Sequence, residues 1–315
     1  MTDPIPFIRT VRGDIPTDSL GLILPHEHLF VDLRGWQTPG YGEGDPREVA
    51  AVVKPYLDEA QAAGVTALVE CSTLGVGRNV PVLAHLASLT PIHIVAPTGV
   101  YRDALVPASM RDLSAEQLAE RWVADLTEGM DGTAIRAGWI KIAMSDDGPT
   151  PLEARILKAA AQASRATGAV VGSHTIGGRA ARAELDILEA NGMDMRRFIW
   201  IHTQSEPDVA VHLEAARRGA YVEYDAIGAP YASDEGMLDA AIRVLEAGYG
   251  DQILLSHDAG WYEPGQPGGL PPAGYRGYTA LTETFLPALR ARGVSEADIT
   301  RLTVTNPARA FAFGG

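Results

Sequence analysis

Eight short apolar runs alternate with eight amphipathic, alanine-rich stretches along this 315-residue chain, and this alternation predicts an α/β protein folded as a (β/α)8 TIM barrel. Parallel strands need a crossover connection, which is usually a helix. Eight strand–helix units in about 290 residues match the usual size of such a barrel. An open, doubly wound sheet is the alternative that the pattern leaves open.

The strands are expected where apolar or β-branched residues form short runs, because strands buried beneath helices are apolar on both faces. The eight runs are residues 20–28, 65–73, 92–101, 137–144, 169–175, 198–204, 220–227 and 253–259. The eight helices are expected at residues 46–63, 78–87, 114–128, 151–167, 178–191, 206–218, 234–247 and 278–292.

Residue types at the ends of the helical stretches support these boundaries. Ser114 precedes Gln117 by three residues, which is the spacing of a capping box. A glycine follows several stretches at the position where helices commonly end in the left-handed conformation. These glycines are Gly64, Gly168, Gly192, Gly219 and Gly248.

Two segments lie outside the repeat. Residues 1–19 precede the first barrel strand, which begins near residue 20, and we expect them to form a small β element. Residues 261–277 contain four prolines and five glycines, so we expect a long loop rather than a helix. In a barrel this loop follows strand 8 and covers the carboxyl ends of the strands, where active sites lie. No linker divides residues 1–315, so a single domain is expected.

Composition narrows the range of functions. Lys and Arg number 26 and Asp and Glu number 40, and a net charge of −14 disfavours nucleic acid and anionic membranes as partners. No apolar run reaches the roughly 18 residues of a membrane span, and residues 1–12 lack the apolar core of a signal peptide. We therefore expect a cytoplasmic enzyme with a small-molecule substrate. The single cysteine, Cys71, excludes an intrachain disulfide and a cysteine-based zinc site.

Histidine and aspartate residues gather at the carboxyl ends of the expected strands. His26 and His28 alternate on the first strand, so both side chains face the same way and form a pair of potential metal ligands. His174, His202 and Asp258 end the fifth, sixth and eighth strands. A closed barrel would bring all five side chains to one place.

Lys141 lies in the middle of an apolar strand, where an unpartnered ammonium would be costly. A salt bridge to a neighbouring acid is one explanation. The other is reaction of the neutral amine with carbon dioxide to give a carbamate, because burial favours the neutral amine and the product is an oxygen ligand for metals.

The order of these residues resembles the binuclear metal amidohydrolase superfamily, and more closely its phosphotriesterase family, including the phosphotriesterase-like lactonase branch. Further stretches carry the likeness over essentially the whole chain. They are Val11-Arg12-Gly13-Asp14-Ile15, Leu20 to His28, Gly99-Val100-Tyr101, Gly138-Trp139-Ile140-Lys141, Ser256-His257-Asp258 and Asn306-Pro307-Ala308-Arg309.

The resemblance implies a role for each ligand. His26, His28 and Asp258 would bind a buried metal ion, and His174 and His202 a more exposed one. Carboxylated Lys141 would bridge the two ions. Members of this family are typically homodimers that hold zinc, or cobalt, manganese or iron. Two such ions acidify a shared water, and Asp258 is the natural acceptor for its proton.

The substrate pocket is less well defined by the sequence. Tyr101 ends the third strand beside the expected metals, where the resemblance implies that it orients substrate or water. Tyr224 and Asp225 end the seventh strand and are expected to face the pocket. Lactonases of the family often carry an Asp-Arg pair here, whereas this chain has alanine after Asp225. Trp261 and Tyr262 open the loop after strand 8 and are expected to cover the pocket.

Several functions fit these residues. The hypothesis that the motifs favour is a lactonase that opens lactones with metal-activated water, with phosphotriesters as secondary substrates. A dedicated phosphotriesterase or aryl esterase is the alternative, and a cyclic amidase is a more distant one. A barrel that has lost catalysis fits least well, because the ligand set is complete.

Overall fold

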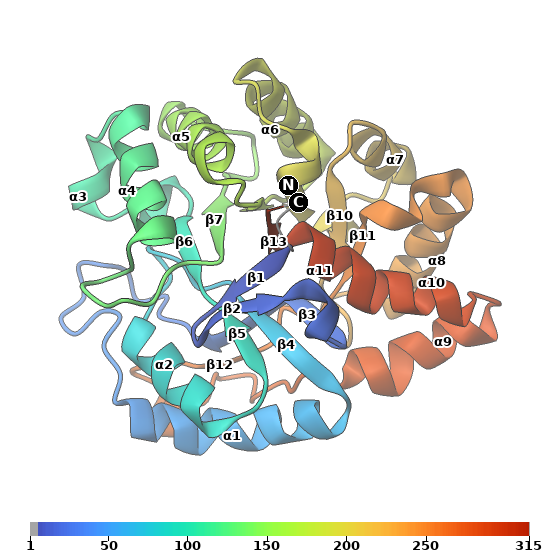
Figure 1. Cartoon of the computed structure of the whole chain (residues 1–315), viewed down its shortest axis with the longest axis horizontal. Coiled ribbons are helices and arrows are strands. Elements are labelled where there is room, and N and C mark those ends of the chain that lie inside the picture. The colour runs from blue at the N-terminus through green and yellow to red at the C-terminus, as the bar shows by residue number, and fades with distance from the viewer. Residues whose placement is uncertain (1–5, 315) are drawn as a thin grey trace, which may run out of the picture.

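The computed structural model describes residues 6–314 and shows parallel strands arranged in a barrel within a ring of helices (Figure 1). All eight expected strands are present. They are β3 (Leu22–Phe30), β4 (Val65–Glu70), β5 (His93–Val95) continued by β6 (Pro97–Val100), β7 (Trp139–Ala143), β8 (Val171–His174), β9 (Phe198–Ile201), β10 (Tyr221–Tyr224) and β11 (Ile253–Leu255).

The strands close into a ring, so the open sheet is excluded. The third expected strand is interrupted at Ala96, where β5 pairs with β4 and β6 pairs with β7. The segment after β11 returns to β3: Asp258 N–H donates to the His26 carbonyl at 3.2 Å, and His28 N–H donates to the Ala259 carbonyl at 2.9 Å. These bonds place Asp258 beside the two histidines.

Each expected helix has a counterpart, although some are shorter. They are α1 (Pro46–Ala62), α2 (Val80–Leu89), α4 (Ala115–Thr127), α5 (Pro151–Thr167), α6 (Gly178–Ala190), α7 (Val209–Arg217), α8 (Asp234–Val244) and α9 (Leu286–Ala291). The capping box of Ser114 and Gln117 is confirmed, and Gly168 ends α5 with φ 78°. Three short helices were not predicted: α3 (Ala108–Arg111), α10 (Glu296–Thr300) and α11 (Asn306–Ala310).

A three-stranded sheet closes the amino-terminal end of the barrel. It contains β1 (Phe7–Thr10) and β2 (Gly13–Pro16), an antiparallel pair that forms the expected small β element, and also β13 (Ala312–Phe313), which the sequence did not predict. Ile8 of β1 packs with Trp139 and Phe311 inside the barrel. The pairing of β1 with β13 brings the first and last strands of the described chain side by side (Figure 1).

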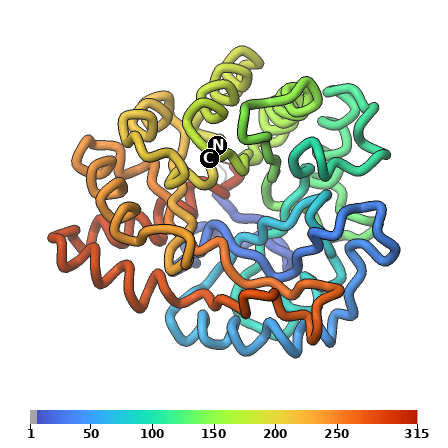
Figure 2. The backbone as a smooth tube through the Cα atoms, turned by 180° about the vertical axis from the view of Figure 1, so that it is seen from behind, coloured from blue at the N-terminus to red at the C-terminus, as the bar shows by residue number. Residues whose placement is uncertain are grey.

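The segment after β11 is mostly a loop, as expected, but it begins with a short strand that the sequence did not predict. Gly260–Tyr262 form a short strand, β12, that pairs in parallel with β3. Figure 2 shows this orange segment crossing the face of the barrel opposite to the one in front in Figure 1. None of the helices in residues 6–314 has the length and apolar composition of a membrane span.

A buried acid on α6 makes the stability of the fold depend on pH. Glu184 is fully buried and accepts hydrogen bonds from the hydroxyl groups of Ser173 and Thr175, the latter at 2.6 Å. Burial raises the pKa of Glu184 to about 8. The unfolded chain therefore binds fewer protons than the folded chain between about pH 4.5 and pH 8, and stability falls as the pH rises through this range.

Glu184→Gln is expected to remove this pH dependence, because the amide keeps both hydroxyl contacts without a charge. The wild type should lose roughly 3–4 kcal/mol more than the variant between pH 5 and pH 8. Urea unfolding at several pH values measures the difference. Glu189→Gln, at an exposed position of the same helix, is the control. Parallel stability curves for wild type and Glu184→Gln would contradict the assignment.

Candidate metal centre

All six predicted ligands lie on the barrel strands or directly after them. His26 and His28 belong to β3, Lys141 to β7 and His174 to β8, while His202 follows β9 and Asp258 follows β11. His202 and Asp258 have left-handed backbone, with φ of 65° and 49°. The chain turns sharply at both positions as it leaves the strand, so both side chains reach toward the same centre.

One group of ligand atoms surrounds the Asp258 carboxylate. Its Oδ1 lies 3.3 Å from His26 Nε2 and 3.1 Å from His28 Nε2. Burial tends to raise the pKa of Asp258, but the charges of His26 and its hydrogen bonds to both histidines hold it well below the usual value. Asp258 is therefore an ionised carboxylate with two imidazoles directed at one of its oxygens.

A second group of ligand atoms lies beside the first. His174 Nδ1 is 2.8 Å from His202 Nε2 and 3.0 Å from the Tyr101 hydroxyl. Burial, and then the charge of His202, hold the pKa of His174 well below its usual value. Neutral imidazole is the form that binds metals. Ligand atoms of His26, His202 and Asp258 lie within 4.8 Å of one another, so the two groups are adjacent.

Lys141 is only 2% exposed, and its ammonium has no hydrogen bond or ion pair with any residue in the 6–314 range. The salt bridge considered from the sequence is therefore not formed. Burial and the nearby charge of Lys141 both oppose protonation of His26, although its pKa is raised well above the usual value, and both help to lower the pKa of His174. A buried amine without an anion, beside nitrogen and oxygen donors that suit divalent transition metals, fits a binuclear site with a carboxylated lysine.

Buried partners fix the orientation of the histidines. His202 Nδ1–H donates to Asp225 Oδ1 at 2.7 Å, and its backbone N–H donates to Oδ2 at 2.8 Å. Nδ1 is thereby held as a donor, and Nε2 is directed at His174. His28 Nδ1 bonds to the Ser72 hydroxyl at 2.8 Å. Such partners set the tautomer and the ring orientation of metal-binding histidines.

Glu27 and Arg276 hold the turn that presents Asp258. The Glu27 carboxylate accepts hydrogen bonds from His257 Nδ1–H at 2.5 Å and from the backbone N–H groups of His257 and Ala259 at 3.1 and 3.0 Å. From the other side, the Arg276 guanidinium donates to the carbonyls of His257 and Asp258. Both residues position Asp258 without contacting the metal-facing atoms.

Glu27→Gln is expected to lower kcat about 10- to 100-fold while the protein remains folded. The amide places an N–H group against donors that need an acceptor, so the turn and Asp258 should shift. Steady-state kinetics, together with circular dichroism, would measure the effect. Asp18→Asn, on the opposite side of the barrel, is the control. Unchanged kcat in Glu27→Gln would contradict the positioning role.

The other predicted pocket residues divide into two groups. Trp261 lies beside the centre, with its ring 5.9 Å from that of His28, and Asp225 lies behind His202. Tyr224 faces the opposite way and its hydroxyl bonds to His212 at 3.0 Å, because strand alternation directs Asp225 inward and Tyr224 toward α7. Tyr262 stacks on Phe30, away from the histidines. Tyr224 and Tyr262 are not among the residues that line the cavity beside the centre.

Sequence reasoning missed several residues that support the centre. Glu27, Glu223 and Ser72 are all buried, and Glu223 Oε2 lies 3.7 Å from His26 Nδ1. For Glu27 and Glu223, the sequence did offer a signal: each is a carboxylate within an apolar strand, where an unpaired charge would be costly. Arg276 carried no such signal, because it lies in a loop.

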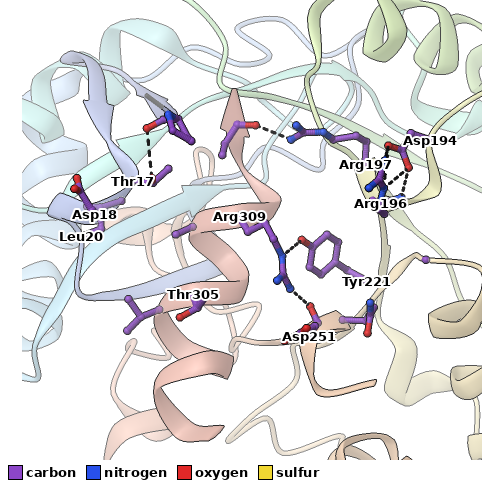
Figure 3. A pocket seen from close by; sticks show the side chains of 16 residues that line it. Thr17, Asp18, Leu20, Asp194, Arg196, Arg197, Tyr221, Asp251, Thr305 and Arg309 are labelled. Atoms are coloured by element: carbon purple, nitrogen blue, oxygen red, sulfur yellow. Dashed lines mark hydrogen bonds and ion pairs between the residues drawn. The ribbon is translucent and has the colours of Figure 1, made fainter. Parts of the chain in front are cut away.

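A cavity of about 770 Å³ opens beside the centre. Its lining includes His174, His202 and Asp258, and it extends past Tyr231 between α7 and α8. A second cavity, of about 810 Å³, lies at the amino-terminal ends of β9, β10 and β11 (Figure 3). There Arg309 donates to the Tyr221 hydroxyl at 3.1 Å, and Arg196 pairs with Asp194. The cavity of about 770 Å³ is the candidate substrate site, because three of the predicted metal ligands line it.

Comparison with known proteins agrees with this geometry. Residues 6–311 match the model of the phosphotriesterase family. A phosphotriesterase homology protein of Mycobacterium tuberculosis is 32% identical over 98% of both chains, and an N-acetyltaurine hydrolase of Danio rerio is 28% identical over 97% of this chain and 98% of its own. An organophosphorus hydrolase structure from Deinococcus radiodurans superposes with a TM-score of 0.89 and 30% identity, over 99% of this chain and 98% of that chain.

Proposed function

This chain belongs to the phosphotriesterase family, and we propose that it is a binuclear metal-dependent hydrolase that preferentially opens lactones. The observation that carries the proposal is the convergence of two groups of ligand atoms, around Asp258 and between His174 and His202, beside a buried Lys141. The single hydrolase domain would span residues 1–315.

Six side chains would hold two divalent ions. His26, His28 and Asp258 would hold one, while His174 and His202 would hold the other. Lys141 would bridge both after its neutral amine adds to carbon dioxide, which forms an N–C bond and releases a proton. Zinc suits this imidazole and carboxylate set, and cobalt, manganese and iron are the alternatives. When bound, the ions would acidify water and polarise the carbonyl oxygen of the substrate.

The protein's own residues would then move the proton. Asp258 is ionised and borders the cavity, so it can accept a proton from the attacking water. It would return that proton to the alkoxide that leaves when the ring opens. Tyr101, whose pKa burial raises, stays protonated and can donate a hydrogen bond to a substrate oxygen. Asp225 would keep His202 directed at the centre.

Amides and phosphotriesters are the competing substrate classes. One similar structure is of a mutant lactonase from Deinococcus radiodurans with a TM-score of 0.88 and 31% identity, over 96% of this chain and 99% of that chain. The N-acetyltaurine hydrolase relative makes an amide the second candidate. Position 226, directly after Asp225, is alanine, whereas lactonases of the family often carry arginine there. This difference counts against the lactone and in favour of the competing classes.

A side-by-side hydrolysis assay of metal-loaded protein tests the proposal. The panel contains γ- and δ-lactones, acyl-homoserine lactones, an aryl ester, an N-acyl amide and an activated phosphotriester. The proposal expects kcat/KM of about 10⁴ M⁻¹s⁻¹ or more for a lactone, well above the other classes. Faster turnover of the amide or the phosphotriester would replace the lactone assignment.

We further propose that the enzyme is a cytoplasmic homodimer. The support for the dimer is the family resemblance. Light scattering of the purified protein measures the mass directly, and a monomeric mass would contradict the dimer.

A further inference from the structure

The cavity beside the metal centre continues as a groove along one face of α8. The helix contributes residues at intervals of three or four, which share a face. They are Gly236, Met237, Asp239, Ala240 and Arg243, together with Ser233, which caps the helix. Positions 233 to 243 span about 15 Å along the helix, a length that an extended dicarboxylic acid of about ten to twelve carbon atoms covers.

Gly236 keeps this groove open. It lies in the first turn of α8, where its backbone N–H donates to the Ser233 hydroxyl that caps the helix, at 3.1 Å. Its φ is not left-handed, and a Cβ would meet only Ser233 Cβ and Oγ, both at 3.6 Å, which is ordinary contact. The backbone and the nearest neighbours therefore do not require glycine. A larger side chain at position 236 would instead fill the groove.

The walls of the groove are mainly apolar. Ile176, Pro207 and Val209 line it opposite Met237 and Ala240 of α8. Apolar walls favour a hydrocarbon chain over a charged one, because a charge between them would lose its hydration. The groove starts at His174 and Asp258, so a chain lying in it would be attached to the group that reacts.

The charges along the groove differ in whether they have partners. Glu206 accepts hydrogen bonds from the backbone N–H groups of Gly178 and Asp208, at 2.8 and 2.9 Å. Asp239 pairs with Arg292. Arg243, at the far end, has no hydrogen bond or ion pair with any other part of the chain that the structure describes. The groove therefore ends at a cation that is available to an anion.

We propose that this groove binds an apolar arm of the substrate whose free end carries an anion, a carboxylate or a sulfonate, and that Arg243 pairs with that anion. The inference rests on the proposed function, because it takes the histidine cluster as the reacting end. Substrates would be elongated molecules with a hydrolysable bond at one end and an acid at the other. Because both ends of the molecule must bind, the site would prefer such substrates over shorter or neutral esters.

Calorimetric binding of product-like acids to the metal-loaded protein tests the inference without catalysis. The probes are decanedioate, which carries a carboxylate at both ends, and decanoate, which carries one. We expect decanedioate to bind about three- to tenfold more tightly than decanoate. Arg243→Gln should abolish this difference and leave decanoate binding unchanged. Gly236→Leu should weaken both probes at least tenfold.

Two substitutions outside the groove are the controls. Ala247→Leu adds side-chain volume at an exposed position beyond the end of α8, and Arg217→Gln removes an exposed cation from α7. Neither should change binding. Equal affinity for the two probes in the wild type, or wild-type behaviour in Arg243→Gln or Gly236→Leu, would overturn the inference.

The same measurements separate this inference from the proposed function. If no lactone is hydrolysed but binding depends on Gly236 and Arg243 as expected, the groove assignment holds and the lactone assignment fails. If lactones are hydrolysed but binding is insensitive to both substitutions, the lactonase proposal holds and the groove assignment fails.

Discussion

Asp258→Asn is expected to fold normally and to lose at least about 10³-fold in kcat. The amide has nearly the shape of the carboxylate, so the turn between Glu27 and Arg276 should be preserved. It cannot accept the proton of the attacking water, and it removes the negative charge toward which His26 and His28 point. Both losses act on the transition state, so the effect should be on kcat rather than on KM.

Stopped-time assays across pH, with metal content measured on the same samples, check this expectation. Asp186→Asn, at an exposed position paired with Arg218, is the matched control and should retain wild-type kcat. Turnover within about threefold of the wild type in Asp258→Asn would remove Asp258 from proton transfer. Loss of metal together with activity would assign Asp258 a ligand role without testing the proton transfer.

Lys141→Ala is expected to reduce bound metal from about two ions per chain to one or fewer, and activity by several orders of magnitude. The proposed carbamate supplies the negative charge that allows two cations to lie close together, and alanine removes it. The same chemistry makes metal loading depend on carbon dioxide. Protein prepared in buffer free of carbon dioxide should bind less metal, and bicarbonate should restore it.

Lys141→Met is the companion variant, because it keeps most of the buried volume and avoids the cavity that alanine leaves. It should unfold near the wild-type temperature and still lose metal, as measured by elemental analysis. Intact mass under native conditions should show one carbon dioxide adduct in the wild type and none in either variant. Two tightly bound ions in Lys141→Met would contradict the bridging role.

The strand–helix alternation was sufficient to predict the barrel, since each strand must be apolar on both faces and each crossover must be amphipathic. The sequence did not predict β13, which has only two residues and no periodic signal, and becomes a strand only because β1 lies beside it. It also missed α10 and α11, which have five residues each and depend on packing rather than on their own pattern.

The candidate metal ligands could be proposed from the sequence because their chemistry is local. His26 and His28 share a strand face, and His174, His202 and Asp258 each end a strand, so the fold class alone implies that they meet. Tyr224 and Tyr262 were also expected at the pocket but are not among the residues that line the cavity. Each is adjacent to a residue near the centre, and the side chains of neighbouring residues on a strand point to opposite faces.

The sequence by itself determined the barrel and the set of residues that could hold two metal ions, because strand periodicity and residue type fix both. The tertiary structure decided how those residues are supported and what space adjoins them. Glu27 and Arg276 hold Asp258 across large sequence separations, and α8 faces the loop after β9. Such contacts depend on how elements pack against one another, and no short stretch of sequence records that packing.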